Sequence, residues 1–246
     1  MTDPDRRVLR LSGPETTDFL QNLVTNDVER LKDGLVYTAL LTPQGKYRAD
    51  FFLVPDGEDI LVDVAEPLAE DLTKALKLYK LRAKVTLEQT GLVPARGTGP
   101  APDGAFADPR DPALGWRAYD GRPSETDVDW PALRVAAAVP ESGIELTPDT
   151  FILEAGFERL GGVDFRKGCY VGQEVTARMK HKTELKKGLA RVTVEGTAPV
   201  GTDITAGAKR VGTLFTQAGG AGLAHLRFPQ ATAKMQAGDA IVRYEA

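Results

Sequence analysis

The sequence predicts an α+β fold for residues 1–184, followed by a small β-barrel domain over residues 185–246. In the first region helical and strand-like segments are mixed, and the strands come as hairpins rather than in steady strand–helix–strand alternation. That order is typical of α+β proteins rather than of parallel-sheet proteins. From Leu185 onward, short apolar runs alternate with glycines, which is typical of a small barrel or sandwich.

Residue spacing predicts the individual elements, because strands alternate with a period of 2 and helices with a period of about 3.6. In the first region we expect strands at 7–11, 36–41, 49–54, 59–64, 84–88 and 116–119, and helices at 15–23, 67–79 and 130–137. The strands at 36–41 and 49–54 form a hairpin around Lys46, since Pro43 and Gly45 favour a turn. Residues 94–112 hold five prolines and three glycines, so we expect an irregular connection there.

The rest of the chain is interpreted in the same way. Residues 163–165 are expected to end a strand, and a helix is expected to begin at Gln173. In the C-terminal domain the expected strands are 189–194, 209–215, 222–226 and 240–244. These elements place residues 166–172 in a loop between a strand end and a helix N-terminus.

Composition narrows the class of protein. A hydrophobic content of 42% is ordinary for a soluble globular chain, and a net charge of −4 argues against a strongly basic nucleic-acid binder. No apolar run approaches the length of a membrane span. The N-terminal segment is polar, and there is one cysteine in 246 residues, so we expect a reducing, cytoplasmic location.

Cys169 is that single cysteine, and its surroundings favour a reactive thiol. Arg166 and Lys167 place positive charge beside it, and Gly168 and Gly172 let the backbone turn tightly. Cations and the N–H groups at a helix start stabilise a thiolate. The alternative is a small buried hydrophobic residue, the commonest role of a free cysteine. The polar neighbours favour the functional interpretation, with Cys169 and Lys167 as the reactive pair.

A metal site built by this chain alone is not expected. One cysteine and two histidines, His181 and His225, cannot supply a four-thiolate cluster site. Any cluster would have to be shared with a second copy, with glutathione or with a partner protein.

The segment around Cys169 resembles the signature of the YgfZ proteins, which are folate-binding relatives of the glycine-cleavage T-protein. The signature reads K-G-C-Y-x-G-Q-E, and all of its defined positions are present in residues 167–174. Further similar segments cover 19–28, 41–46, 78–85, 108–110, 115–117, 154–157, 162–166 and 176–178, so the likeness spans nearly the whole chain. A mitochondrial iron–sulfur assembly factor belongs to the same group.

The resemblance implies a fold and a ligand. It implies intertwined α+β subdomains around a central cavity that binds tetrahydrofolate or a related reduced folate, followed by a C-terminal barrel. The folate-binding residues that it indicates are Glu154, Asp50, Tyr170 and Arg178, while Gly168, Gly172, Gln173 and Glu174 complete the signature. Glu154 matches the glutamate that contacts the pteridine in the T-protein. Arg178 could instead pair with Glu174 on the helix surface.

The chain departs from the T-protein at one chemical position. The T-protein has paired aspartates on the equivalent hairpin strand, whereas this chain has Ala49 and Asp50. The loss of one carboxylate puts aminomethyl transfer in doubt. The T-protein also lacks the signature cysteine, so Cys169 places the chain on the iron–sulfur branch of the group.

Three functions remain open. The first is a tetrahydrofolate-binding accessory protein in iron–sulfur cluster assembly or repair, with the assembly machinery or client iron–sulfur enzymes as partners. The second is a folate-dependent aminomethyl or one-carbon transferase, in which Asp50 would be the base. The third is a non-catalytic folate-binding adaptor. No nucleic-acid or membrane partner is expected.

Overall fold

The computed structural model describes residues 6–181, 184–231 and 234–244 and divides the chain into two compact units. The first unit joins Met1–Val128 with Phe157–Ala177, and the second joins Asp129–Gly156 with Arg178–Ala246. Residues 129–156 therefore group with the C-terminal region, whereas residues 157–177 return to the first unit. Sequence spacing does not reveal this arrangement. The predicted boundary after residue 184 stays a prediction.

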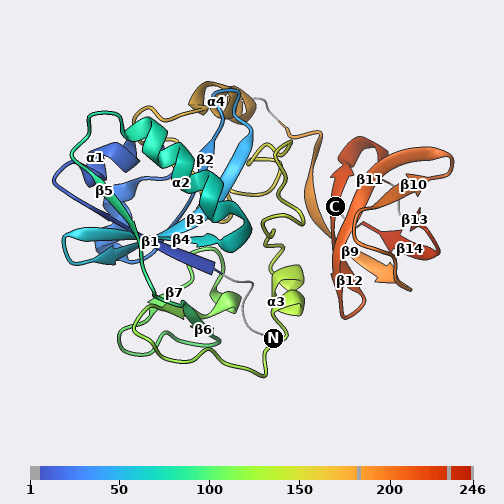
Figure 1. Cartoon of the computed structure of the whole chain (residues 1–246). Helices are drawn as coiled ribbons and strands as arrows, with labels where there is room; N and C mark the ends of the chain where they lie inside the picture. Colours follow the sequence, from blue (N-terminus) through green and yellow to red (C-terminus); the bar gives the residue numbers. More distant parts are fainter. Residues whose placement is uncertain (1–5, 182–183, 232–233, 245–246) are drawn as a thin grey trace. The chain divides into compact units, whose positions relative to one another are not determined.

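A five-stranded antiparallel sheet forms the centre of the first unit (Figure 1). Its strands, in the spatial order β2-β3-β4-β1-β5, are β1 (Arg6–Ser12), β2 (Val36–Leu41), β3 (Tyr47–Asp56), β4 (Asp59–Ala65) and β5 (Thr86–Gln89). The hairpin predicted around Lys46 is confirmed as β2–β3, with Ala39 opposite Asp50. The mixed α+β class predicted for this region is also confirmed.

One face of the sheet packs on two helices, α1 (Thr16–Gln21) and α2 (Glu66–Lys80). Side chains alternate along a strand, so Phe51 and Leu53 of β3 enter this core while Asp50 and Phe52 lie on the opposite face. The helix α2 begins with a proline in its first turn, where no backbone N–H is needed.

Charged residues cover part of the opposite face. The segment before and within β8 (Trp116–Ala118) brings Asp108, Arg110 and Arg117 to the sheet, where Arg117 lies 4.2 Å from the ring centroid of Phe52. The Asp108 carboxylate accepts hydrogen bonds from Arg110 at 2.7 Å and from Arg117 at 3.1 Å. Burial acts to raise the pKa of Asp108, but the two arginines outweigh it and hold that pKa at about 2. The cluster is buried, and its charges are paired.

The connection predicted to be irregular contains short strands. A three-stranded sheet is formed by β6 (Ala95–Gly97), β8 and β7 (Phe106–Ala107). Two or three residues are too few to show a period, so the sequence prediction missed β6 and β7. Short 3₁₀ segments lie at Val28–Asp33, Pro112–Leu114 and Phe228–Gln230.

The second unit contains a closed six-stranded barrel, as predicted for the C-terminal region. Its strands are β9 (Lys187–Glu195), β10 (Thr202–Ala206), β11 (Lys209–Ala218), β12 (Ala221–Arg227), β13 (Met235–Ala237) and β14 (Ala240–Arg243). Closure leaves no exposed sheet edge. The helix α3 (Trp130–Ala136) contacts β11, and Arg134 donates to Thr216 and Glu145.

The helix α4 (Gln173–His181) begins where predicted, at Gln173. The strand end expected at residues 163–165 is wrong: the segment is irregular, and the Asp164 side chain accepts the Arg166 N–H in a tight turn. Among the described helices, none has the length and apolar character needed to cross a membrane.

Candidate functional site

The candidate site is the irregular segment 164–172, which we call the signature loop. Its sulfur is accessible, because Cys169 is a free cysteine on the surface. Gly168 beside it is also exposed, whereas Lys167 and Tyr170 on either side are buried. The loop therefore buries its flanks and presents the thiol.

Lys167 fastens the loop to the N-terminal part of the first unit. Its Nζ donates to the carbonyl oxygens of Gln21 at 2.7 Å, Val24 at 2.5 Å and Asn26 at 3.0 Å. Burial lowers the pKa of Lys167 to about 8, so at neutral pH the ammonium has three N–H groups for three carbonyls. The sequence predicts that this charge acts on the thiol. In the structure, the ammonium is held by backbone carbonyls, and a catalytic role for Lys167 stays a prediction.

The C-terminal side of the loop is held by Tyr170 and Gln173. The ring of Tyr170 packs beneath the ammonium of Lys167, with 5.3 Å from Nζ to the ring centroid. Burial raises the pKa of Tyr170. The Gln173 backbone N–H donates to the Tyr170 carbonyl at 3.2 Å, and its side-chain amide donates to the Gly168 carbonyl at 3.3 Å. These bonds enclose Cys169 in a short turn whose ends are fixed.

The two glycines of the signature have different roles. Gly172 has a φ of +83°, and a Cβ there would lie 2.7 Å from the Thr42 carbonyl oxygen and 3.0 Å from the Leu41 Cβ. Only glycine permits the loop to approach the β2–β3 hairpin so closely. At Gly168 a Cβ would meet nothing within 4 Å.

Gly172→Ala is expected to destabilise the protein, whereas Gly168→Ala is its matched control. At Gly172 the new methyl group meets backbone atoms at a positive φ, so we expect a loss of about 1–3 kcal/mol in the free energy of unfolding. At Gly168 we expect a change within about 0.5 kcal/mol. Urea unfolding followed by tryptophan fluorescence measures both. Equal effects at the two positions would contradict the assigned packing of the loop.

Asp50 lies on the sheet face opposite the helices and is bound by two tyrosines. The Tyr37 hydroxyl donates to Oδ2 at 2.9 Å, and the Tyr47 hydroxyl donates to Oδ1 at 2.6 Å. Burial, followed by the charge of Asp50, raises the pKa of Tyr37 well above its usual value, so this tyrosine is a neutral donor. The sequence analysis missed both tyrosines. The available signal was strand alternation, since Tyr37 pairs with Phe52, two residues from Asp50.

Glu154 lies in the second unit and contacts the barrel. Its Oε2 is 3.2 Å from Nζ of Lys187 and 3.6 Å from Nε2 of His225, and its carbonyl accepts the Leu189 N–H at 2.6 Å. Burial acts to raise the pKa of Glu154, but hydrogen bonds from His225 and Lys187 outweigh it and lower that pKa. The sequence does not indicate these two partners, because they are far from Glu154 along the chain.

The predicted site residues thus fall in two units. Cys169, Lys167, Tyr170 and Asp50 belong to the first, whereas Glu154 and the exposed Arg178 belong to the second. Glu174 is exposed in the first turn of α4. Within the described ranges, no group of three His, Cys, Asp or Glu side chains could hold a metal ion.

Three comparisons relate the chain to known proteins. Residues 186–246 match the family model described as the C-terminal beta-barrel domain of CAF17. The chain is 30% identical over 273 residues to the mitochondrial iron–sulfur cluster assembly factor IBA57 of Homo sapiens, covering 90% of this chain and 75% of that protein. It is 34% identical over 215 residues to the IBA57 homologue of Pyricularia oryzae, covering 74% of this chain and 54% of that protein.

A solved structure has the same fold. The glycine cleavage system aminomethyltransferase T of Bartonella henselae superposes with a TM-score of 0.74 at 14% sequence identity, covering 96% of this chain and 81% of that one. At this identity the likeness concerns the fold alone. The resemblance to the T-protein fold is thereby confirmed, while the narrower resemblance to the YgfZ proteins and the central cavity stay predictions.

The expected cytoplasmic location is contradicted. The relatives from Pyricularia oryzae, Neurospora crassa, Mus musculus and Homo sapiens are all named mitochondrial proteins. The expectation rested on a single cysteine and on overall composition, which indicate a reducing environment but do not distinguish one reducing compartment from another.

Proposed function

The chain belongs to the family of IBA57 iron–sulfur cluster assembly factors, and on that premise we propose that it assists cluster assembly through the thiol of Cys169. The observation that carries the proposal is the geometry of the signature loop, which is fixed at both ends and exposes its sulfur. The chain spans about half the length of the fungal relatives that it matches.

A single thiol defines what the chain can contribute to a cluster. Iron–sulfur clusters are held by several ligands, commonly four thiolates. The chain has one cysteine, so in this proposal Cys169 supplies one ligand and the others come from another molecule, either a partner protein or glutathione. The cluster is therefore cargo that is shared and passed on. An exposed thiol on a fixed loop suits this role, because a second molecule can approach it.

Complementation tests the proposed function. In cells that lack their own member of this family, expression of the chain should restore the activity of an iron–sulfur dehydratase. In the deficient cells, chemical reconstitution of the cluster in the extract should restore the same activity, which shows that the cluster and not the enzyme is missing. Failure of the expressed, folded chain to restore activity would contradict the proposal.

We further propose that the chain binds a reduced folate, with Glu154 as the ligand for the pteridine edge. Its Oε2 faces Lys187 and His225, whereas Oε1 accepts no hydrogen bond from the described residues and suits a ligand N–H donor. Tyr170, Arg178 and Asp50 stay proposed folate ligands from the family resemblance. Transferase activity is not proposed, because β3 carries the single Asp50 carboxylate beside Ala49, where the T-protein has a pair of aspartates.

Titration with tetrahydrofolate tests folate binding. Trp116 and Trp130 are both buried and lie in different units, so their fluorescence reports on both. Glu154→Gln should weaken binding by about 10- to 100-fold, since hydrogen bonds to charged groups contribute about 1.5–3 kcal/mol. Asp203→Asn, an exposed carboxylate on the barrel, is the control and should have no effect. Absence of binding at millimolar ligand would contradict the folate proposal and leave the role of Cys169 untouched.

A further inference from the structure

Residues 77–84 are strongly cationic in a chain that is acidic overall. The segment contains Lys77, Lys80, Arg82 and Lys84 and no acidic residue, whereas the whole chain has a net charge of −4. It comprises the last turn of α2 and the connection to β5. In the part of the chain that the structure describes, none of these four side chains forms an ion pair. Their charge is therefore available to another molecule.

The same segment exposes two leucines. Leu78 has 69% of its surface accessible and Leu81 has 84%, whereas Leu72 and Leu76 of α2 are buried in the core. Leu81 also has a φ of +44°, which side chains other than glycine rarely adopt. The backbone at Leu81 is therefore strained, although the side chain that it carries lies mostly in solvent. Such outliers occur preferentially at sites of binding or switching.

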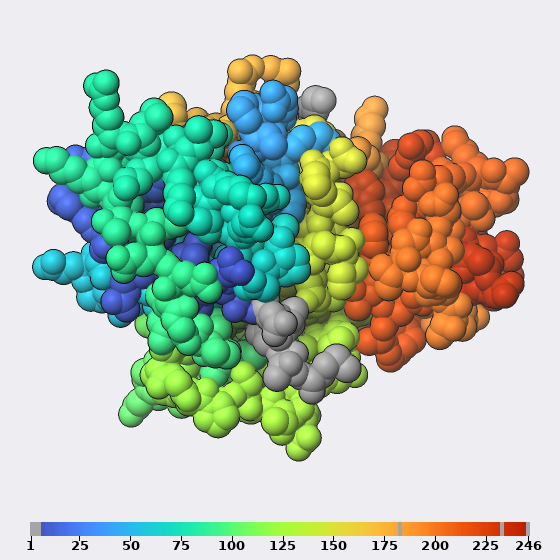
Figure 2. Space-filling view, in the orientation of Figure 1, coloured from blue at the N-terminus to red at the C-terminus, as the bar shows by residue number. Residues whose placement is uncertain are grey.

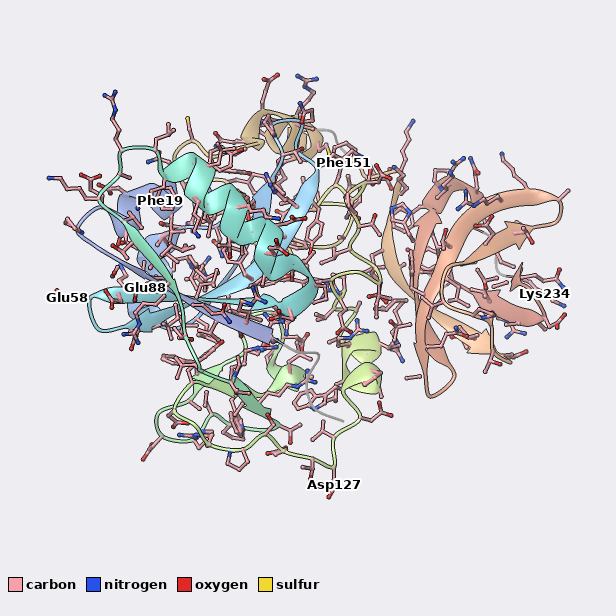
Figure 3. The ribbon with its side chains drawn as sticks, in the orientation of Figure 1. Phe19, Glu58, Glu88, Asp127, Phe151 and Lys234 are labelled. Atoms are coloured by element: carbon pink, nitrogen blue, oxygen red, sulfur yellow. The ribbon has the colours of Figure 1, made fainter. Side chains whose placement is uncertain are left out.

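A groove lies beside these leucines. It has a volume of about 320 Å³, and its apolar lining comes from Phe19 and Leu23 near α1 and from Tyr79 and Ala83 at the end of α2. Glu15 and Asp18 also line it. Figure 3 labels Phe19 on this side of the unit, and in Figure 2 teal side chains from this part of the chain project from the surface. Exposed apolar surface, a concave groove and unpaired cations are thus adjacent.

We propose that the 77–84 segment and this groove bind an acidic segment of a partner protein, one that carries large apolar side chains between carboxylates. The carboxylates would pair with Lys77, Lys80, Arg82 and Lys84. One apolar side chain would enter the groove against Phe19 and Tyr79, and others would contact the exposed Leu78 and Leu81. Exposed leucines among basic residues also suit an anionic membrane surface. The groove favours a peptide, because an apolar side chain of a peptide can enter it whereas a flat bilayer cannot, and the carboxylates of Glu15 and Asp18 require that the entering side chain be uncharged.

This surface goes beyond the proposed cluster chemistry, because it uses neither Cys169 nor Glu154. A fluorescein-labelled short peptide of alternating glutamate and leucine is the probe, and fluorescence anisotropy is the measurement. We expect saturable binding that weakens at high salt, since exposed charge pairs are screened. The matching lysine–leucine and glutamate–serine peptides should not bind.

Two variants and two matched controls decide the result. Leu81→Ser and Arg82→Glu should each weaken binding by about tenfold or more, because an apolar anchor and a paired charge are lost. Val200→Ser and Lys209→Glu likewise replace an exposed apolar and an exposed basic side chain, but in the second unit, and should not alter binding. Leu81→Gly removes the strain of the positive φ, so the melting temperature of this variant should be no lower than that of the native chain. It should still bind the glutamate–leucine peptide more weakly.

Three results would overturn the proposal. One is no binding of the glutamate–leucine peptide at millimolar concentration. Another is binding that Leu81→Ser and Arg82→Glu leave unchanged. The third is that the protein does not bind the peptide but sediments with vesicles of phosphatidylcholine and phosphatidylglycerol, and that both variants lose this sedimentation. That result would assign the surface to a membrane instead.

Discussion

Cys169→Ser is expected to abolish the restoration of iron–sulfur enzyme activity while leaving the fold intact. The side chain is exposed, and the loop is held by Lys167, Tyr170 and Gln173 rather than by the sulfur. Serine has nearly the same shape but does not supply a thiolate at neutral pH. We expect cluster delivery to fall by at least about 10- to 100-fold, because losing a residue that only supports a metal ligand already costs that much. The dehydratase assay in complemented cells measures this loss.

A second experiment separates chemistry from folding. The chain has one cysteine, so treatment of the purified native protein with N-ethylmaleimide modifies that thiol alone. The alkylated protein should match Cys169→Ser in cluster delivery to an apo-enzyme in vitro, and Gly168→Ala should match the native chain. A serine variant or an alkylated protein with full activity would show that the sulfur is not the functional group.

Asp108→Asn is expected to cause the largest loss of stability of any single side-chain change considered. Asp108 is 5% exposed and binds both Arg110 and Arg117. Asparagine is neutral, so Arg110 loses the carboxylate that pairs with it, and the buried Arg117 loses its nearer partner while Asp63 stays 3.5 Å away. Breaking a buried ion pair in this way costs about 3–5 kcal/mol. The midpoint of urea unfolding should fall accordingly, together with the melting temperature.

Asp120→Asn is the matched control. Asp120 binds Arg122 at the same sequence spacing as Asp108 binds Arg110, and the pKa of each carboxyl is held at about 2. The side chain of Asp120 is 44% exposed, however, so solvent screens the pair and we expect no measurable change in stability. Equal losses at the two positions would contradict the importance of burial.

The ion pairs of Asp108 also make the free energy of unfolding depend on pH. The pKa of Asp108 is lower in the folded protein than in the unfolded chain, so its stabilisation is complete above about pH 4 and disappears as pH falls toward about 2. The difference of about two pKa units corresponds to about 2–3 kcal/mol. The loss of stability between these pH values should be smaller in Asp108→Asn than in the native chain.

Local patterns in the sequence predicted the regular parts of the fold well. The strands β1 to β4, the helix α2 and most barrel strands have clear alternation or helical spacing over several residues, and these predictions are confirmed. The short strands β6, β7 and β13 span only two or three residues. They form by pairing with other strands, β6 and β7 with β8 and β13 with β10 and β14, and they are too short to show a period along the chain.

The candidate site shows the same division between local and distant information. The sequence identified Cys169 and the glycines of its loop, since all of them lie within a few residues. It assigned the charge of Lys167 to the thiol, whereas the ammonium binds carbonyls of residues more than a hundred positions away. The partners of Asp50 and Glu154 were likewise missed, because Tyr37, Lys187 and His225 meet them only in the folded chain.

The most direct test of the account is the rate at which Cys169 is alkylated. Iodoacetamide should modify the native protein at neutral pH at a rate comparable to that of the urea-unfolded chain, because the loop presents the sulfur to solvent. Gly172→Ala, which disturbs the packing of the loop on the β2–β3 hairpin, should change the alkylation rate of the folded protein, and Gly168→Ala should not. A native thiol that stays unmodified while the unfolded thiol reacts would contradict the central claim that the sulfur is offered to a second molecule.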